Sequence, residues 1–171
     1  MSKLVVYMPA YDNNNAVGTV QWANVAGVTA EAGGIFAEAQ PTANQITQYA
    51  EAKGGDFSAL PDAATLNSVK VEWLKHNQAT SPTMYDNSVR VAPGGVISGD
   101  DKSAGNAWLS GGGVRFDSYG GPGDPSPLWS VFTVANLKDP LTTFLLSGKA
   151  LGGSFGAVAK IEACRVIVDY T

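Results

Sequence analysis

Glycine and proline interrupt this sequence so often that few windows are long enough for a stable helix. The 171 residues contain 20 glycines and 9 prolines, whereas an isolated helix needs roughly 12–15 uninterrupted residues. Between these breaks, apolar and polar residues mostly alternate, which is the period of a strand with one buried face. Many short strands joined by turns predict an all-β protein, either an antiparallel sandwich or a barrel.

The alternation is clearest in two segments. The C-terminal segment places four side chains on one apolar face, namely Cys164, Val166, Val168 and Tyr170. Residues 66–76 form a second such strand, with Val69, Val71 and Trp73 on its apolar face. Other strands are expected at 4–8, 35–39, 46–52, 84–91, 114–116, 129–132 and 142–146. The best helix candidate is a short turn at 133–138, which Thr133 can cap and Pro140 limits.

Size and charge define the class of protein. A length of 171 residues predicts one domain, and 44% hydrophobic residues are enough for a core. The 11 basic and 15 acidic residues give a net charge of −4 without a basic cluster, so we expect no nucleic-acid partner. No apolar stretch approaches the roughly 18 residues that span a bilayer, so we expect no membrane partner. One cysteine and the absence of a signal-like segment after Lys3 predict folding in a cytoplasm.

Motifs for catalysis are weak. Residues 152–156 match the G-x-S-x-G elbow of serine hydrolases, but the only histidine, His76, precedes Ser154 instead of following it. Cys164 lies within a strand on its apolar face, where a cysteine behaves as a buried hydrophobic residue with a raised pKa. Phosphate-binding and dinucleotide-binding fingerprints are missing. We therefore expect no enzyme, no catalytic residue and no cofactor.

Loop carboxylates and tryptophans leave alternatives open. Five aspartates could together bind calcium: Asp86, Asp100, Asp101, Asp117 and Asp124. No D-x-D-x-D-G spacing is present, however, and the commoner role of such aspartates is to stabilise turns. We expect no metal. Trp22, Trp108 and Trp129 stand near glycine- and proline-rich loops, where aromatic side chains stack on sugars, anchor interfaces or pack in the core.

Several short phrases of the sequence form a familiar series. The first half contributes 22–25, 32–37, 56–61 and 64–72, and the second half contributes 86–91 (DNSVRV), 119–121 with 128–129, 132–137 and 159–170. In this order they resemble phrases of β-sandwich domains in tailed-phage and prophage virion proteins. The sequence departs from this pattern at Phe132, where tryptophan is frequent, and in the inserted residues 125–127. The resemblance implies a jelly-roll-like sandwich over residues 22–171, with 1–21 as an N-terminal arm or first strand.

The resemblance also implies a role. We expect a non-enzymatic structural protein of the virion, assembled in the host cytoplasm. The favoured role is a capsid decoration or cement protein that binds the major capsid protein as a homotrimer. Low surface charge suits such a role, because obligate interfaces are depleted of charge. The alternative is a tail or fibre module that binds a host surface glycan.

The N-terminal apolar run is the main candidate for attachment. Leu4, Val5, Val6, Tyr7 and Met8 are rich in β-formers and lie outside the region of resemblance. Together with Trp22, Trp108 and Trp129 they are the expected interface residues. An unpaired strand of this kind must be covered, either by another chain, if 1–11 is an attachment arm, or by the domain's own sheet.

Overall fold

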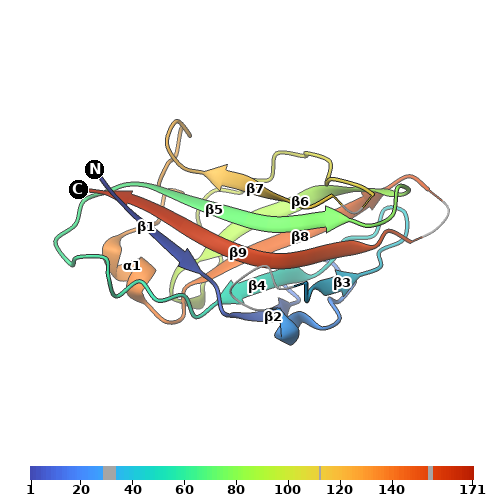
Figure 1. The fold of residues 1–171 in the computed structure, drawn as a ribbon, viewed down its shortest axis with the longest axis horizontal. Coiled ribbons are helices and arrows are strands. Elements are labelled where there is room, and N and C mark those ends of the chain that lie inside the picture. The colour runs from blue at the N-terminus through green and yellow to red at the C-terminus, as the bar shows by residue number, and fades with distance from the viewer. Residues whose placement is uncertain (29–33, 112, 154–155) are drawn as a thin grey trace.

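Two antiparallel sheets pack face to face in the computed structural model, which describes residues 1–28, 34–111, 113–153 and 156–171 (Figure 1). The first sheet has the order β1 (Ser2–Tyr7), β9 (Ala159–Tyr170), β5 (Leu66–Asn77) and β7 (Arg115–Gly120), and β3 (Ala37–Ala39) also pairs with β9. The second sheet has the order β2 (Ala10–Asn14), β4 (Tyr49–Lys53), β8 (Thr143–Leu151) and β6 (Thr83–Ala92). The predicted all-β sandwich is therefore confirmed.

The connections between the sheets make the sandwich jelly-roll-like. From β4 onward each strand lies in the opposite sheet from the strand before it, and β1 pairs with the last strand, β9. This alternation between two packed sheets is the pattern of jelly rolls. It brings the two termini side by side at one end of the molecule (Figure 1).

The core lies between the two sheets, where the alternating patterns meet. Val71 pairs with Val166 and Val69 with Val168, and all four side chains are buried. Trp73 and Cys164 continue this layer, as their positions in the two patterns predicted. Phe144 and Leu146 on β8 are buried in the same cluster and close the core from the second sheet.

Register shifts within the strand pairs change which side chains face the core. The β5–β9 register shifts between Leu74 and Lys75, so that Ile161 and Cys164 both belong to the core although they are three positions apart. The β6–β8 register shifts between Asp86 and Ser88. An extra residue in one strand reverses the alternation beyond it, so a strict two-residue period fails along both strands.

The short segments fall partly where the sequence predicted them. Helix α1 (Val134–Lys138) begins after Thr133, whose hydroxyl oxygen accepts a hydrogen bond from Asn136 N at 3.1 Å. The strand expected at 129–132 is wrong, because Trp129 and Ser130 have φ of 55° and 60° and form a left-handed turn. Two 3₁₀ turns, η1 (Val25–Gly27) and η2 (Pro93–Gly95), complete the elements.

The first residues of the chain belong to the sandwich. In β1, Leu4 lies opposite Val168 and Val6 opposite Val166 on β9. Met8 is fully buried, and the chain then passes into β2 in the other sheet. Of the two arrangements left open, the structure has pairing with the domain's own sheet, and β1 forms an edge of it.

Candidate functional site

The three loop tryptophans of the expected interface are core residues. Each indole is buried and donates to an internal acceptor: Trp22 Nε1 to Gln48 O at 2.8 Å, Trp108 Nε1 to Asp86 Oδ1 at 2.8 Å and Trp129 Nε1 to Val69 O at 3.0 Å. Trp22 also stacks on Trp108, with ring centroids 6.4 Å apart. Buried in this way, they have no face to offer a sugar ring or a partner chain.

The apolar N-terminal run is only partly accessible. Val6 and Met8 point into the core, and Leu4 and Tyr7 are half-buried. Val5 lies on the outer face of the edge strand with 45% of its surface exposed. Of these five residues, Val5 is therefore the one that a partner reaches most easily.

Two of the three residues weighed for catalysis, Cys164 and His76, are described by the structure, and both are buried. Ser154 lies outside the described residues. Cys164 is fully buried, and burial raises the pKa of its thiol, so the thiol stays protonated. His76 is also buried, and its Nδ1 lies 3.6 Å from Glu162 Oε1.

Four of the five aspartates contact lysines, and the fifth accepts hydrogen bonds from a serine hydroxyl and a backbone amide. Asp86 and Asp117 both contact Lys75 Nζ. Asp100 and Asp124 both lie at Lys102 Nζ, at 3.5 and 2.5 Å. Asp101 accepts hydrogen bonds from Ser88 Oγ at 2.6 Å and from Val89 N at 3.0 Å. Across the described ranges, no group of three or more histidine, cysteine, aspartate or glutamate side chains is placed to hold a metal ion.

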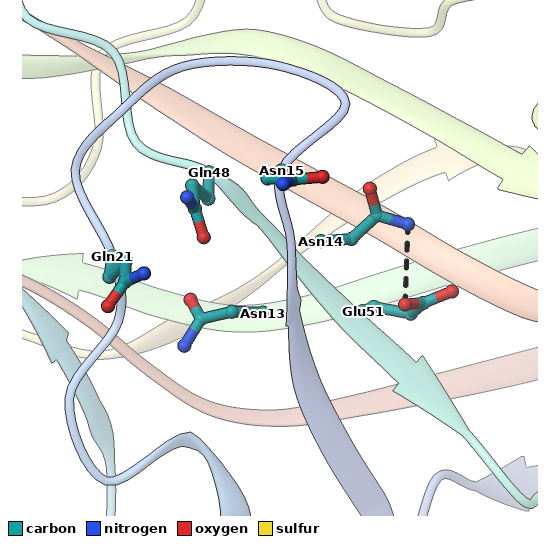
Figure 2. Close-up of a pocket in the computed structure, with 6 residues that line it drawn as sticks. All are labelled: Asn13, Asn14, Asn15, Gln21, Gln48 and Glu51. Carbon is teal, nitrogen blue, oxygen red and sulfur yellow. Dashed lines mark hydrogen bonds between the residues drawn. The ribbon is translucent and has the colours of Figure 1, made fainter.

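An amide-lined hollow beside β2 and β4 is the candidate binding site. It has a volume of about 430 Å³, within the usual range for small-molecule sites. Figure 2 shows its six lining residues: Asn13, Asn14, Asn15, Gln21, Gln48 and Glu51. The amides of Asn13, Gln21 and Gln48 lie on one side of β2, and Asn14 and Glu51 lie on the other (Figure 2).

Backbone contacts hold the wall of this hollow in place. Asn13 forms two hydrogen bonds with the backbone of Trp22, from its Nδ2 to the carbonyl oxygen at 2.9 Å and from the Trp22 amide to its Oδ1 at 2.8 Å. Gln48 N donates to Val20 O at 2.7 Å. These hydrogen bonds involve the backbone of Val20 and Trp22, the residues on either side of Gln21. They therefore fix the backbone position of Gln21.

The side chains offer both donors and acceptors. Asn14 Nδ2 donates to Glu51 Oε2 at 3.3 Å, the one hydrogen bond drawn between the six residues in Figure 2. Thr143 Oγ1 donates to Glu51 Oε1 at 2.8 Å and orients that carboxylate. An amide donates through nitrogen and accepts through oxygen, so the hollow suits a ligand rich in hydroxyl groups.

Sequence reasoning did not identify this site. Its one local signal is the run of three asparagines at 13–15, a residue type depleted in strands. Gln48 and Glu51 lie more than thirty residues further along the chain, and only the pairing of β2 with β4 brings them to the same place.

Comparison of the chain with protein-family models, with curated proteins and with solved structures found no match. Within the part of the chain that the structure describes, none of the helices has the length and apolar character needed to cross a bilayer.

Proposed function

We propose that this chain is a non-enzymatic structural protein of a phage particle that decorates the head shell. The phrases that resemble virion proteins include two of the paired strands of the sandwich: 86–91 lies within β6 and 159–170 is β9. A jelly-roll-like frame built on these strands is the fold that the resemblance implies. The major capsid protein is the proposed partner, and a homotrimer is the proposed unit on the shell.

The observation that carries this proposal is the position of β1. It stands at the edge of its sheet, and an edge strand presents backbone donors and acceptors to which a second chain can add a strand. Val5 lies exposed on this strand, while Val6 and Met8 anchor it in the core. The strand is thus held firmly on one side and open to pairing on the other.

Binding to shells tests the proposal. Purified head shells of the phage that encodes the chain are mixed with the purified protein and sedimented. The parent protein is expected to sediment with the shells. Val5→Lys is expected to weaken binding at least about tenfold, or about 1.4 kcal/mol, because a lysine on an edge strand opposes strand addition.

The matched control is Val96→Lys. Val96 is also an exposed valine, with 68% of its surface accessible, and it lies outside β1, just after η2. This variant is expected to bind like the parent, and both variants are expected to melt like the parent. Failure of the parent protein to bind shells would overturn the decoration role. Equal binding by both variants would show that β1 is not the strand that contacts the shell.

A second candidate function rests on the amide-lined hollow. A tail or fibre module that binds a host surface glycan needs converging donors and acceptors, and Asn15, Gln21 and Gln48 supply them beside Glu51. Since the three tryptophans are buried, such binding would depend on hydrogen bonds rather than on aromatic stacking.

Calorimetry with purified surface polysaccharide of the host tests this second function. Gln21→Ala removes an exposed amide from the hollow, and Gln78→Ala removes an exposed amide elsewhere, after the end of β5. On the glycan hypothesis the parent and Gln78→Ala bind and Gln21→Ala binds more weakly. Absence of heat with the parent protein contradicts the hypothesis.

A further inference from the structure

A lysine and an aspartate meet in the centre of the sandwich, between its two sheets. Lys75 comes from β5 and Asp86 from β6, and their side chains are 0% and 1% exposed. Lys75 Nζ is in direct contact with Asp86 Oδ1. Residues 78–82 connect the two strands, so the contact closes a short loop of the chain.

Three further side chains surround this pair. Tyr119 on β7 places its hydroxyl 2.6 Å from Lys75 Nζ and 2.7 Å from Asp86 Oδ2. Trp108 Nε1 donates to Asp86 Oδ1 at 2.8 Å, and its ring centroid lies 4.7 Å from Lys75 Nζ. Asp117 on β7 brings Oδ2 to 3.4 Å from Lys75 Nζ. Both oxygens of Asp86 therefore have a donor besides the lysine.

Burial in this environment weakens the preference of the amine for its charged form. Taking two charges out of water is energetically unfavourable for each ion. Burial lowers the pKa of the Lys75 ammonium, although the charges of Asp86 and Asp117 oppose this effect. Transfer of a proton from Nζ to Asp86 leaves an amine in contact with a carboxylic acid, and an uncharged amine is a nucleophile.

We propose that Lys75 and Asp86 condense to an isopeptide bond that joins the two sheets covalently. The pair is held in contact by two packed sheets, and such positioning is equivalent to an effective concentration of roughly 10⁵–10⁸ M in well-oriented intramolecular reactions. No oxidant, cofactor or second protein takes part in this condensation.

The step balances with water as its only other product. The neutral Nζ attacks Asp86 Cγ, a nitrogen–carbon bond forms, and the carbonyl electron pair moves to Oδ1. Trp108 Nε1 stabilises the negative charge on Oδ1, as a donor at this distance does in an oxyanion hole. Oδ2 already carries the proton of the carboxylic acid, and the proton that Nζ loses on bond formation passes to it through the Tyr119 hydroxyl. The electron pair on Oδ1 then re-forms the carbonyl, the Cγ–Oδ2 bond breaks, and Oδ2 leaves with its two protons as water.

The product suits the site better than the reactants do. The new amide is neutral, so neither of the buried charges of the pair remains. Its oxygen keeps the hydrogen bond from Trp108, and its N–H lies beside Asp117. A buried polar group costs little when it is hydrogen-bonded, and both groups of this amide have a partner in place.

Mass spectrometry of the full chain tests the proposal. The denatured parent protein is expected to be lighter than its sequence by one water molecule. Trypsin cleaves after free lysine but not after an acylated one, so digestion is expected to give residues 71–90 as one peptide lacking one water. Cleavage of that peptide after Tyr85 is expected to leave two pieces that stay joined.

Two variants locate the bond. Lys75→Arg removes the nucleophile, so its mass is expected to equal the mass calculated from its sequence. Lys102→Arg is the matched control, because Lys102 also pairs with two aspartates but lies nearer to solvent. This control is expected to keep the deficit of one water.

The parent protein alone decides the outcome, whether or not Lys75→Arg folds. A parent mass equal to the sequence mass, with tryptic cleavage after Lys75, overturns the proposal. A deficit of one water that persists in Lys75→Arg overturns the assignment of the bond to this residue.

Discussion

A single hydroxyl group, on Tyr119, lies between the two reacting side chains at the centre of the sandwich. Its distances to Lys75 Nζ and Asp86 Oδ2 are both within hydrogen-bonding range. Burial raises the pKa of this hydroxyl, with the negative charge of Asp86 adding to the effect, so it stays protonated and donates. It is therefore placed to carry a proton from nitrogen to oxygen.

Tyr119→Phe keeps the ring and removes this relay. We expect condensation to slow about 10²-fold or more, the lower end of what a positioned general acid or base contributes. Intact masses of freshly purified protein, followed over hours of incubation, are expected to show a mixture that moves toward the lighter form. The parent is expected to be complete at the first time point, and a variant as complete as the parent would show that the hydroxyl carries no proton in this step.

Gly148 determines whether Trp108 can reach Asp86. A Cβ at this position would lie 2.6 Å from Met84 Cε and 2.9 Å from Trp108 Cζ2, which is closer than packed atoms tolerate. Gly148→Ala is expected to displace the indole and to lower the free energy of unfolding by about 1–3 kcal/mol. Urea unfolding measures this loss.

Gly156→Ala is the control for that experiment. A Cβ there would have its nearest neighbour at 3.7 Å, an ordinary contact. We expect the free energy of unfolding to stay within about 1 kcal/mol of the parent value. Equal losses in the two alanine variants would contradict the packing assigned to Trp108.

The buried lysine had a signal in the sequence, but its partners did not. Lys75 follows Val69, Val71 and Trp73 at every second position of the strand, so the alternation of 66–76 places it on the core face with them. Asp86 was grouped with the loop carboxylates although it falls within the strand expected at 84–91, and it lies in β6. Asp117 was expected in a loop just after 114–116, and it lies in β7. Which of the aspartates meets Lys75 depends on how β6 and β7 pack around β5, and that information is not local.

Among the strands described, β9 pairs with the largest number of neighbouring strands. It pairs with β1, β3 and β5, and its alternating pattern was the clearest one in the sequence. The alternation predicted its last seven residues correctly. It did not predict the bulge near Glu162, because an extra residue leaves no period of its own in the sequence.

Val168→Asp tests the register of β9. Val168 is fully buried between Leu4 and Val69, so the variant places an unpaired charge in the core at a cost of several kcal/mol. We expect unfolding or a large loss of melting temperature, measured by circular dichroism. Val96→Asp, at an exposed position, is the control and is expected to melt like the parent. If Val168→Asp also melts like the parent, the register described for β9 is wrong.

At the scale of the whole molecule, sequence reasoning succeeded for the class of fold and failed for the distant contacts. Short alternating segments and frequent turns predicted a sandwich, because strand period and turn chemistry are local properties. The burial of Trp22, Trp108 and Trp129 was one of three alternatives left open, since a tryptophan beside a loop has the same local pattern whether it is packed or exposed. The amide-lined hollow depends on the pairing of β2 with β4, which local patterns do not specify.

The carboxyl groups with shifted pKa values predict how stability depends on pH. Burial alone raises the pKa of Glu72, but hydrogen bonds from Lys70, Arg165 and Ser118 outweigh it and hold the pKa below its usual range. The stabilisation from Glu72 is therefore present above its unfolded pKa of about 4.3 and is lost as the pH falls through the lower folded value. Asp101 acts in the same direction, since hydrogen bonds from Ser88 and Val89 outweigh the effect of burial.

The alkaline limb has the opposite cause. Burial raises the pKa of Cys164, with the charge of Glu72 adding to it, and burial also raises the pKa of Tyr11, whose hydroxyl oxygen accepts from Cys164 N at 2.6 Å. Above about pH 8.5 the unfolded chain releases the thiol proton while the folded chain keeps it, so stability falls by up to about 1.4 kcal/mol per pH unit for this group.

Melting temperatures from pH 3 to 10 are expected to be highest between about pH 6 and 8. Cys164→Ala removes the thiol, so its melting temperature is expected to fall less steeply than that of the parent between about pH 8.5 and 10; parallel curves for the two proteins would show that Cys164 titrates as it does in the unfolded chain.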